Sequence, residues 1–526
     1  MKTTVKKSLC LLTAVFLSVT AGFGQIRIDW QQCYGSSGYD GGYGIQSLGD
    51  GYRVLSSTSE RDGMCHCGSY HGVWLFDLNP DLSIRLQQCK EYSIPSKLVR
   101  NESGETFSIG VAYTYDKKLF VDKLDEAGIA AWSVLVGPTS GDATALTNSH
   151  ATATDDGGVA ALFPISAASG DVTVHYGGYD CWVVKLDTEG QLEWERTFGN
   201  EGDDTPRCIV KARDGGLIVG MTSAQTGNGN VGCGQPENSS VLVKLDAGGN
   251  VEWDLCLPSV EFADLLELEE GYLLAGTLRH TADPEANCGD GIYTRDCAMM
   301  RCDDEGNVLW FKEYGGSCNE SLVRVFGDGE YGFTVFANTK SNDGDVASAA
   351  SLGVTDAEQG NVWVFHVDAQ GGLVWERCIG SSKGLLEQVS DVARSDDGSF
   401  TLVGEMTWFA EESSGDVCCS NNALLPNSLT NIWVLHLTDV YDHTEVRDTA
   451  EEGITMLPNP TSRYVTITGE SLRRVEIHNV LGQKVATVNA DSNEVTIDLS
   501  GLPQGVYLVE TTLADGRQAT GKLLVR

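Results

Sequence analysis

Residues Asp180–Trp194 read DCWVVKLDTEGQLEW, and most of the chain repeats this segment with variations. Trp182, Val184 and Leu186 alternate with the residues between them, which is the period-2 pattern of a half-buried β-strand. Gly190 suits the positive φ of a hairpin turn, and a second strand then carries the tryptophan. The segment therefore predicts two antiparallel strands joined by a tight turn.

The interval from Asp187 to Trp194 recurs along the chain with a glycine in the turn each time. The other copies and their glycines are Asp125–Trp132 with Gly128, Asp246–Trp253 with Gly249, Asp303–Trp310 with Gly306, and Asp368–Trp375 with Gly371. Asn79–Leu86 is a degraded copy, and Trp433–Thr438 keeps the first strand without the later tryptophan. Five matches at one spacing indicate a repeat architecture.

Two further strands precede each copy. The first leads into an acidic glycine turn such as DDGG at 155–158 or RDGG at 213–216. The second is apolar, as in LIVG at 217–220, and a longer loop connects it to the WVVKLD-type strand. Short strands in regular series predict an all-β fold, and a repeat of this length predicts a propeller or a solenoid.

The ends of the repeat region favour a closed ring. Ile26–Gly35, IRIDWQQCYG, resembles a fourth strand with nothing before it, and the last repeat stops after its third strand at Leu437. The first strand can therefore complete the last sheet, which leaves no exposed edges. We predict a seven-bladed β-propeller over residues 26–440, in which Trp30 lies close to Trp433.

Charge excludes some functions. The 526 residues carry 74 acidic and 36 basic side chains, a formal net charge of −38. Nucleic acids and anionic membrane surfaces require a basic footprint, so the charge argues against both partners. The general interpretation of this charge is solubility through self-repulsion. The more specific alternative is that the protein binds cations or a basic partner.

The first 25 residues have the pattern of a signal peptide. Lys2, Lys6 and Lys7 precede an apolar run that is too short to cross a bilayer, and no later stretch is long enough to serve as a transmembrane segment. Removal of Cys10 with this segment leaves 15 of the 16 cysteines. In an exported protein we expect these to form disulfides, with at least one left over because the number is odd.

Residues 441–453 read as a polar linker, and residues 454–526 differ from everything before them, with seven acidic and seven basic side chains. Short alternating stretches predict strands at Tyr464–Ile467, Val475–Ile477, Val495–Leu499, Val506–Glu510 and Lys522–Val525. We predict a small C-terminal β-sandwich.

This segment resembles the type A C-terminal sorting domain of the type IX (Por) secretion system of Bacteroidetes. The resemblance rests on LPNP at 457–460, VEIHNVLGQKV at 475–485, IDLSGLPQGVYLVE at 497–510 and KLLVR at 522–526. It implies passage through the periplasm and outer membrane, with the type IX machinery as partner, and a product that is secreted or held at the cell surface. The sorting motif residues are Pro458, Asn459, Pro460, Gly482, Leu502, Pro503, Gly505 and Tyr507. The repeats also resemble those of uncharacterised Bacteroidetes surface proteins, which implies no activity.

Binding residues are expected on the long loops between second and third strands. Asp171, Asp345 and Asp416 each lie in a Gly-Asp-Val triplet there and are the candidate metal ligands, with Ca²⁺ as the ion because hard cations take oxygen ligands. Further acids lie at or near the starts of first strands: Asp40, Asp142, Asp203, Asp264, Glu320 and Asp391. The alternative, which their repetition favours, is that each carboxylate accepts backbone N–H bonds in its own turn. No other cofactor is indicated.

Other residues give weaker indications. The ligands in CHCGSYH, Cys65–His71, are spaced more closely than in structural zinc sites, so disulfides are the favoured interpretation. His366 and His436 take the strand position of Lys185, a register that we expect to be solvated, and neither is a catalytic candidate. We interpret the repeated tryptophans as packing residues. No catalytic residue is assigned, since the chain has no GxSxG, HExxH or Walker motif.

These observations predict an exported binding or adhesion-type propeller that recognises an unknown extracellular glycan or protein. One alternative is an extracellular hydrolase or lyase that acts on polysaccharide or peptide with carboxylates on the loop face. A pair of acids with raised pKa values facing one pocket would favour that alternative, whereas acids spread around the ring would favour binding. Another alternative is a structural component of the cell envelope.

Overall fold

The computed structural model divides into two compact units, Met1–Asp439 and Val440–Arg526. The signal peptide, the linker and the Cys65–His71 segment lie outside the described residues. The structure describes residues 26–59, 64, 72–112, 118–139, 149–223, 229–231, 239–257, 260–281, 293–304, 306–352, 360–381, 387–407, 416, 430–439, 454–457, 464–479, 484–499, 502, 505–513 and 518–525.

Within these residues the first unit forms seven four-stranded antiparallel sheets, here called blades 1 to 7 in chain order. Blades 1 to 3 contain β2 (Asp40–Ser47), β3 (Tyr52–Thr58), β4 (Gly72–Leu78), β5 (Ile84–Glu91); β6 (Ser93–Arg100), β7 (Thr106–Ala112), β8 (Lys118–Leu124), β9 (Ala130–Val136); and β10 (His150–Ala153), β11 (Val159–Ile165), β12 (Asp180–Leu186), β13 (Leu192–Phe198).

Blades 4 to 7 follow the same order, with two short 3₁₀ turns in blade 6, η1 (Gly329–Tyr331) and η2 (Ala347–Leu352). Their strands are β14 (Asp204–Lys211), β15 (Leu217–Ser223), β16 (Ser239–Leu245), β17 (Val251–Leu257); β18 (Val260–Glu267), β19 (Tyr272–Thr281), β20 (Tyr293–Cys302), β21 (Val308–Tyr314); β22 (Glu320–Gly327), β23 (Phe333–Thr339), β24 (Asn361–Val367), β25 (Leu373–Ile379); and β26 (Glu387–Arg394), β27 (Phe400–Thr407), β28 (Thr430–Asp439), β1 (Ile26–Tyr34).

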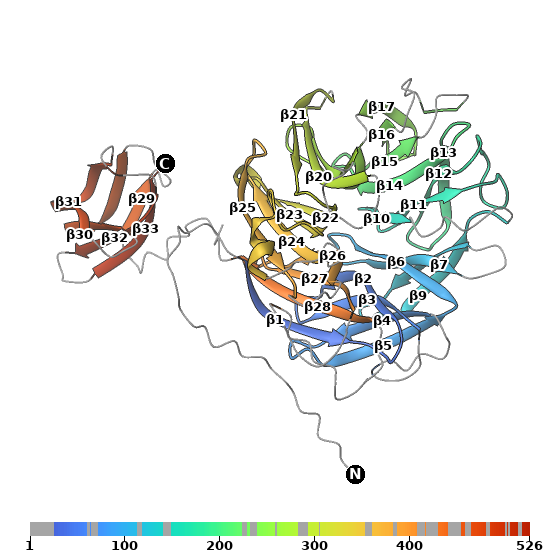
Figure 1. Ribbon diagram of the computed structural model, residues 1–526, viewed down its shortest axis with the longest axis horizontal. Helices are drawn as coiled ribbons and strands as arrows, with labels where there is room; N and C mark the ends of the chain where they lie inside the picture. Colours follow the sequence, from blue (N-terminus) through green and yellow to red (C-terminus); the bar gives the residue numbers. More distant parts are fainter. Residues whose placement is uncertain are drawn as a thin grey trace, which may run out of the picture. The chain divides into compact units, whose positions relative to one another are not determined.

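The blades form a closed ring, because the first strand of each contacts the first strand of the next and β26 contacts β2 (Figure 1). The first unit is therefore a β-propeller. β1 pairs antiparallel with β28 from Ile26 opposite Asp439 to Tyr34 opposite Ile432, and Cys33 lies opposite Trp433. The prediction that the first strand completes the last sheet is confirmed.

Three of the repeated tryptophans join their blade to the next one through a hydrogen bond. Trp132 in blade 2 donates its indole N–H to the carbonyl of Thr188 in the hairpin turn of blade 3, at 2.8 Å. A Cβ on Gly190, whose φ is +80°, would lie only 3.0 Å from that indole. Trp194 and Trp310 make the same contact with the following blade. The turn glycine thus provides both a positive φ and room for the neighbouring ring, and the packing interpretation of these tryptophans holds.

The degraded copy in blade 1 has a substitute for this contact. The fourth strand there carries Leu86 where other blades carry tryptophan. Arg53 instead reaches the turn of blade 2 and donates to the carbonyl of Glu126 at 3.1 Å, next to Gly128. Its guanidinium is buried and makes two hydrogen bonds to Asp77, at 2.8 and 2.9 Å. A paired arginine therefore replaces the indole at this junction.

The second unit is a five-stranded antiparallel sheet of β29 (Ile454–Leu457), β30 (Tyr464–Asn479), β31 (Lys484–Asp498), β32 (Gly505–Leu513) and β33 (Gln518–Val525). The edge strands β29 and β33 contact each other, so the sheet folds over an apolar core. Two strands that were predicted separately, at 464–467 and 475–477, are the two halves of the long strand β30. Register shifts between Thr468 and Arg474 bend it without ending its pairing.

Candidate functional site

Blade 5 departs from the repeat on the face where the loops between second and third strands emerge. Its strands β19 and β20 have ten residues each, whereas the corresponding strands of blades 1 to 4 and 6 have seven. Leu278 opposite Asp296 matches Ile165 opposite Asp180 in blade 3, and the pairing continues to Thr281 opposite Tyr293. This extension, Arg279–Thr281 with Tyr293–Arg295, is here called the raised hairpin.

One face of the raised hairpin is basic. Arg279 and Arg295 lie directly opposite each other on adjacent strands. Glu261 on β18 accepts an ion pair from Arg279 at 2.7 Å and a longer one from Arg207 of blade 4 at 3.6 Å. Burial lowers the pKa of the Arg207 guanidinium, and the charges of Arg279 and Arg295 add to this effect while Glu261 opposes it. Two guanidiniums thus share one carboxylate, and the charge of a third, Arg295, lies nearby.

A further cation, Lys97, lies on the first strand of blade 2, and its charge and that of Arg207 both act on His150 of blade 3. Burial, together with the charges of Lys97 and Arg207, lowers the pKa of His150 to about 3, so this histidine is neutral near pH 7. Neither Lys97 nor Arg295 has a carboxylate at ion-pair distance within the described part of the chain. A local excess of unpaired cations stands out in a chain with a net charge of −38.

The other face of the raised hairpin carries His280, with Asp296 and Glu313 below it on the next two strands. The register places all three on one side of the sheet, since Leu278 pairs with Asp296, His280 with Thr294, and Ala298 with Glu313. The His280 Nε2 atom lies 3.4 Å from Asp296 Oδ2 and 3.4 Å from Glu313 Oε2. Burial, together with the nearby carboxylate of Glu320, raises the pKa of Asp296 to about 6.

The three candidate metal ligands do not come together. Asp171 Oδ2 accepts the backbone N–H of Gly137 at 3.0 Å, and Asp345 Oδ2 accepts that of Gly315 at 3.2 Å. Asp416 instead lies 3.4 Å from the Arg377 guanidinium, and its backbone N–H donates to Gly380. Each aspartate therefore fastens its loop to the end of the fourth strand of the preceding blade, and Asn230 of blade 4 does the same with Gly199 of blade 3.

Most acids near the starts of first strands also accept bonds from the protein. Asp264 accepts the backbone N–H of Val325 in the next blade at 3.0 Å, and Asp391 accepts that of Ile45 at 3.2 Å. Asp203 accepts the N–H of Tyr179, and Asp40 that of Ser36. Asp142 lies outside the described residues. The backbone-acceptor alternative accounts for these side chains.

Four junctions between blades share a further arrangement that sequence reasoning missed. The first residue of a first strand is a buried acid, and it lies beside an aspartate or asparagine in the third strand of the preceding blade. Two of the pairs join two acids, Asp180 with Asp204 and Asp296 with Glu320, and two join an amide to an acid, Asn431 with Asp40 and Asn361 with Glu387.

The acid pair between blades 3 and 4 is closed to solvent, because Asp180 and Asp204 are both 0% exposed. Gly199 lies between their carboxylates, where a Cβ would stand 2.1 Å from Asp180 and 2.9 Å from Asp204. Burial, together with the charges of Asp180 and Asp203, raises the pKa of Asp204 to about 6, against hydrogen bonds from Ser223 and Asn200 that lower it. Burial also raises the pKa of Asp180, against the N–H of Tyr176 and the charge of His175.

We expect this pair to make the propeller less stable as pH rises. Between about pH 4 and pH 6 an aspartate of the unfolded chain loses its proton while folded Asp204 keeps it, so the free energy of unfolding falls across this window. A tenfold difference in proton affinity between the folded and unfolded chain corresponds to about 1.4 kcal/mol. Asp180→Asn gives this junction the amide found at two other junctions. Between pH 4.5 and 7.5 the free energy of unfolding measured in urea should fall by less in this variant than in the wild type, with a difference on the order of 1–2 kcal/mol.

The reciprocal change provides the control for that measurement. Asn361→Asp converts the amide junction at Glu387, whose pKa burial already raises to about 7, into an acid pair. The loss of stability between pH 4.5 and 7.5 should then be larger than in the wild type. Unchanged pH profiles in both variants would show that these carboxylates do not couple.

The expectation that the lysine register of the third strand is solvated is wrong. Lys185, Lys244 and His366 are only 3–4% exposed. The reason is that acidic side chains of a turn and of the next strand cover this position: Lys185 Nζ lies 2.8 Å from both Asp156 and Glu193. His366 contacts the Tyr331 carbonyl and stacks on Trp375.

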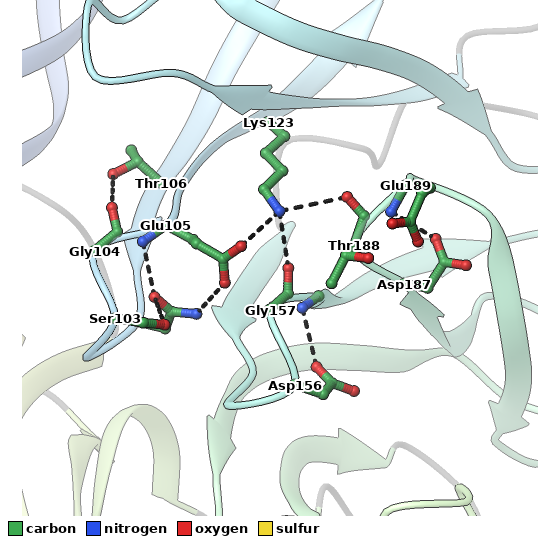
Figure 2. Close-up of polar contacts among 12 residues, drawn as sticks. Ser103, Gly104, Glu105, Thr106, Lys123, Asp156, Gly157, Asp187, Thr188 and Glu189 are labelled. Carbon is green, nitrogen blue, oxygen red and sulfur yellow. Dashed lines mark hydrogen bonds and ion pairs between the residues drawn. The ribbon is translucent and has the colours of Figure 1, made fainter.

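Two further residues occupy the same position of the third strand, His436 in blade 7 and Lys123 in blade 2. His436 is half-buried, stacks on Trp30 with 5.1 Å between ring centroids, and has a pKa that burial lowers. In blade 2, Lys123 bonds Glu105 and the carbonyls of Gly157 and Thr188, which belong to two turns of blade 3 (Figure 2). Side chains at this position therefore bond to neighbouring strands and turns, and the two histidines pack against aromatic rings.

The cysteines follow two patterns. Cys33, Cys89, Cys256 and Cys318 are disulfide-bonded. The expectation of disulfides does not hold for five buried thiols, Cys181, Cys208, Cys297, Cys302 and Cys378. These lie in the apolar layers, where cysteine packs as a small hydrophobic residue. Burial raises the pKa of their thiols, to about 12 for Cys208 and Cys378, so they are inert.

Part of the sorting motif lies in the described residues. Tyr507 on β32 is 5% exposed and belongs to the core of the second unit, with Leu502 packed against that core. Gly505 begins β32. Pro458, Asn459, Pro460, Gly482 and Pro503 lie outside the described residues.

Residues 455–526 match the family described as secretion system C-terminal sorting domain. The chain ends in a type IX sorting domain. This domain implies a Bacteroidetes origin and export by the type IX secretion machinery, with the product secreted or attached at the outer-membrane surface. Among the described residues there is no helix of the length and apolarity needed to cross a bilayer. No curated protein matches the chain.

Several solved structures are similar over much of the propeller. The Dos1 propeller has a TM-score of 0.41 at 7% identity, covering 78% of this chain and 95% of that one. The β-propeller domain of the Trilobed protease from Pyrococcus furiosus has a TM-score of 0.38 at 9% identity, with coverages of 77% and 99%. A protein of unknown function from Dyadobacter fermentans has a TM-score of 0.39 at 8% identity, with coverages of 79% and 99%. Likeness at this level carries no argument about activity.

Proposed function

We propose that this protein is an exported binding propeller that captures a carboxylate- or sulfate-bearing extracellular ligand at the basic face of the raised hairpin. The observation that carries the proposal is the placement of Arg279 directly opposite Arg295, with Arg207 close by. Guanidinium groups bind carboxylate and sulfate through two parallel hydrogen bonds, which fixes the orientation of the bound group.

Like charges directly opposite each other destabilise a pair of strands. Glu261 offsets part of that repulsion, since it accepts from Arg279 at 2.7 Å, but three arginines still lie near one acid. An anionic group beside Arg295 would offset the rest. Arg295 is exposed and Arg207 is half-buried, so a ligand reaches the first while the second forms a fixed base beneath it.

Binding fits the acids of this chain better than hydrolysis does. A glycoside hydrolase needs two carboxylates that flank a bond open to substrate. The best-defined acid pair with raised pKa values, Asp180 and Asp204, is fully buried at a blade junction. Related acids recur at other junctions around the ring, which is the distribution expected of structural groups. No specific observation favours the hydrolase or the envelope-component alternative.

An array of uronate-containing and sulfated glycans, acidic peptides and neutral counterparts tests the proposal with the full-length chain. Binding should be confined to anionic probes, and Arg295→Gln should weaken it by about tenfold or more, the effect expected of a lost charge-assisted hydrogen bond. Lys312→Gln makes the same charge change on the exposed outer strand β21 of the same blade and should leave affinity unchanged.

If glycans bind more strongly than peptides, or the reverse, the preferred class identifies the source of the anionic group. Equal binding to neutral probes would contradict the proposal, as would a loss in Lys312→Gln that matched the loss in Arg295→Gln. Because neither side chain makes an ion pair in the described structure, neither variant is expected to unfold the protein.

A further inference from the structure

We infer that His280, Asp296 and Glu313 form a binding site for a divalent transition-metal ion of the Zn²⁺ class. Their ligand atoms, one imidazole nitrogen and two carboxylate oxygens, all lie within 4.8 Å of one another. The site is on the opposite face of the raised hairpin from the arginines, so this inference does not depend on the proposed anionic ligand.

The distances match tetrahedral coordination. Zinc binds nitrogen and oxygen at about 2.0–2.2 Å, which separates two ligand atoms by about 3.3–3.5 Å when the geometry is tetrahedral. His280 Nε2 lies 3.4 Å from an oxygen of Asp296 and 3.4 Å from an oxygen of Glu313. Despite these distances, Nε2 makes no hydrogen bond with acceptable geometry in the described structure, and neither does the buried Oδ1 atom of Asp296.

The local excess of negative charge also favours cation binding. Asp296, Glu313 and the fully buried Glu320 bring three carboxylates together, and no lysine or arginine pairs with them within the described residues. Buried carboxylates are normally paired or bound to metal. An imidazole ligand favours zinc, copper or nickel over Ca²⁺, which takes oxygen ligands.

A comparison within the chain shows why the site is confined to blade 5. The residue five positions before the anchor of the hairpin turn, which is Asp187 in blade 3, is Trp74, Trp182, Trp363 and Trp433 in blades 1, 3, 6 and 7. In blade 5 it is Ala298, and the residue directly opposite is Glu313. In blade 3 the residue opposite Trp182 is Thr197. Blade 5 therefore places a carboxylate on the face where four other blades place an indole ring.

A second group of similar composition, Glu476, His478 and Glu510, lies in the sorting domain. There Glu476 is already ion-paired with Arg474 and Lys484, and the hydrogen bond from Lys484 and the charge of Arg474 lower the pKa of its carboxyl. A metal ion would have to displace these cations. The two groups thus form a matched comparison in a single chain, with compensated charge in one and uncompensated charge in the other.

The test is metal content and affinity of the full-length chain, stripped with a chelator and then dialysed against micromolar Zn²⁺. One Zn²⁺ per chain should bind, and His280→Gln and Glu313→Gln should each weaken it at least tenfold, since even residues behind the ligands cost about 10–100-fold. The Glu313 side chain is 42% exposed, so that variant should fold normally. His478→Gln, the control in the sorting domain, should bind as the wild type does.

Co²⁺ in place of Zn²⁺ should give the visible absorption of a tetrahedral site, and this absorption should disappear in Glu313→Gln. Three results would overturn the inference. They are no Zn²⁺ retained by the wild type, unchanged affinity in both blade 5 variants, or a loss confined to His478→Gln. Displacement of Zn²⁺ by millimolar Ca²⁺ would contradict the imidazole ligand in particular.

Discussion

A chain that lacks residues 26–34 should fail to fold cooperatively, and moving the same nine residues to a position after Asp439 should restore the propeller. Asp439 lies opposite Ile26 in the closed ring, so a short turn between them would form the hairpin that other blades already have between third and fourth strands. In that rearranged chain Gly35 becomes the first residue of the propeller, and no strand contact is lost.

The magnitude follows from what β1 buries. Ile26 is 0% and Tyr34 2% exposed, and Trp30 stacks on His436. Each large apolar side chain contributes about 1.5–3 kcal/mol when fully buried. Deletion also leaves β28 as an open edge with unpaired N–H and C=O groups. Together these losses approach the whole stability of a typical protein, about 5–15 kcal/mol.

Circular dichroism melting and gel filtration provide the measurement. The deleted chain should show no cooperative transition, or one at least about 10 °C lower, together with association through the open edge. The rearranged chain should elute and melt as the wild type does. A deletion variant with wild-type melting would show that β28 does not need its partner strand.

The architecture could be predicted from the sequence because its determinants are local. A period of two, a turn glycine and a tryptophan seven residues after Asp187 fix the hairpin without reference to any other repeat. Closure was also predictable, because a strand without a preceding partner at Ile26–Gly35 matches a missing strand at the other end. These patterns concern backbone pairing, which repeats impose strongly.

Contacts between repeats were not predictable in the same way. Lys185 is polar in an alternating strand, so it reads as solvated, yet the turn containing Asp156 and the next strand at Glu193 cover it. His280, Asp296 and Glu313 are separated by 33 positions from first to last and come together only through the register of three strands. The available sequence clue was Ala298, where four other repeats have tryptophan.

Removing both carboxylates that hold Lys185 should destabilise the propeller by more than the sum of the two single changes. Lys185 is 5% exposed at its side chain, and its Nζ contacts Asp156 and Glu193 at 2.8 Å and the Leu186 carbonyl at 3.1 Å. In Asp156→Asn or Glu193→Gln one carboxylate still neutralises the ammonium group. In the double variant a buried cation has no counter-ion, and such a group costs about 3–5 kcal/mol.

Each single variant should lose only about 1 kcal/mol, because Asp156 and Glu193 are themselves 54% and 41% exposed and regain water. Urea unfolding at pH 7.5 measures all three. Adding Lys185→Met to the double variant should recover more than half of the loss, since an apolar side chain of similar length removes the unpaired charge. Additive single effects, or no recovery with methionine, would mean that packing rather than charge compensation stabilises this register.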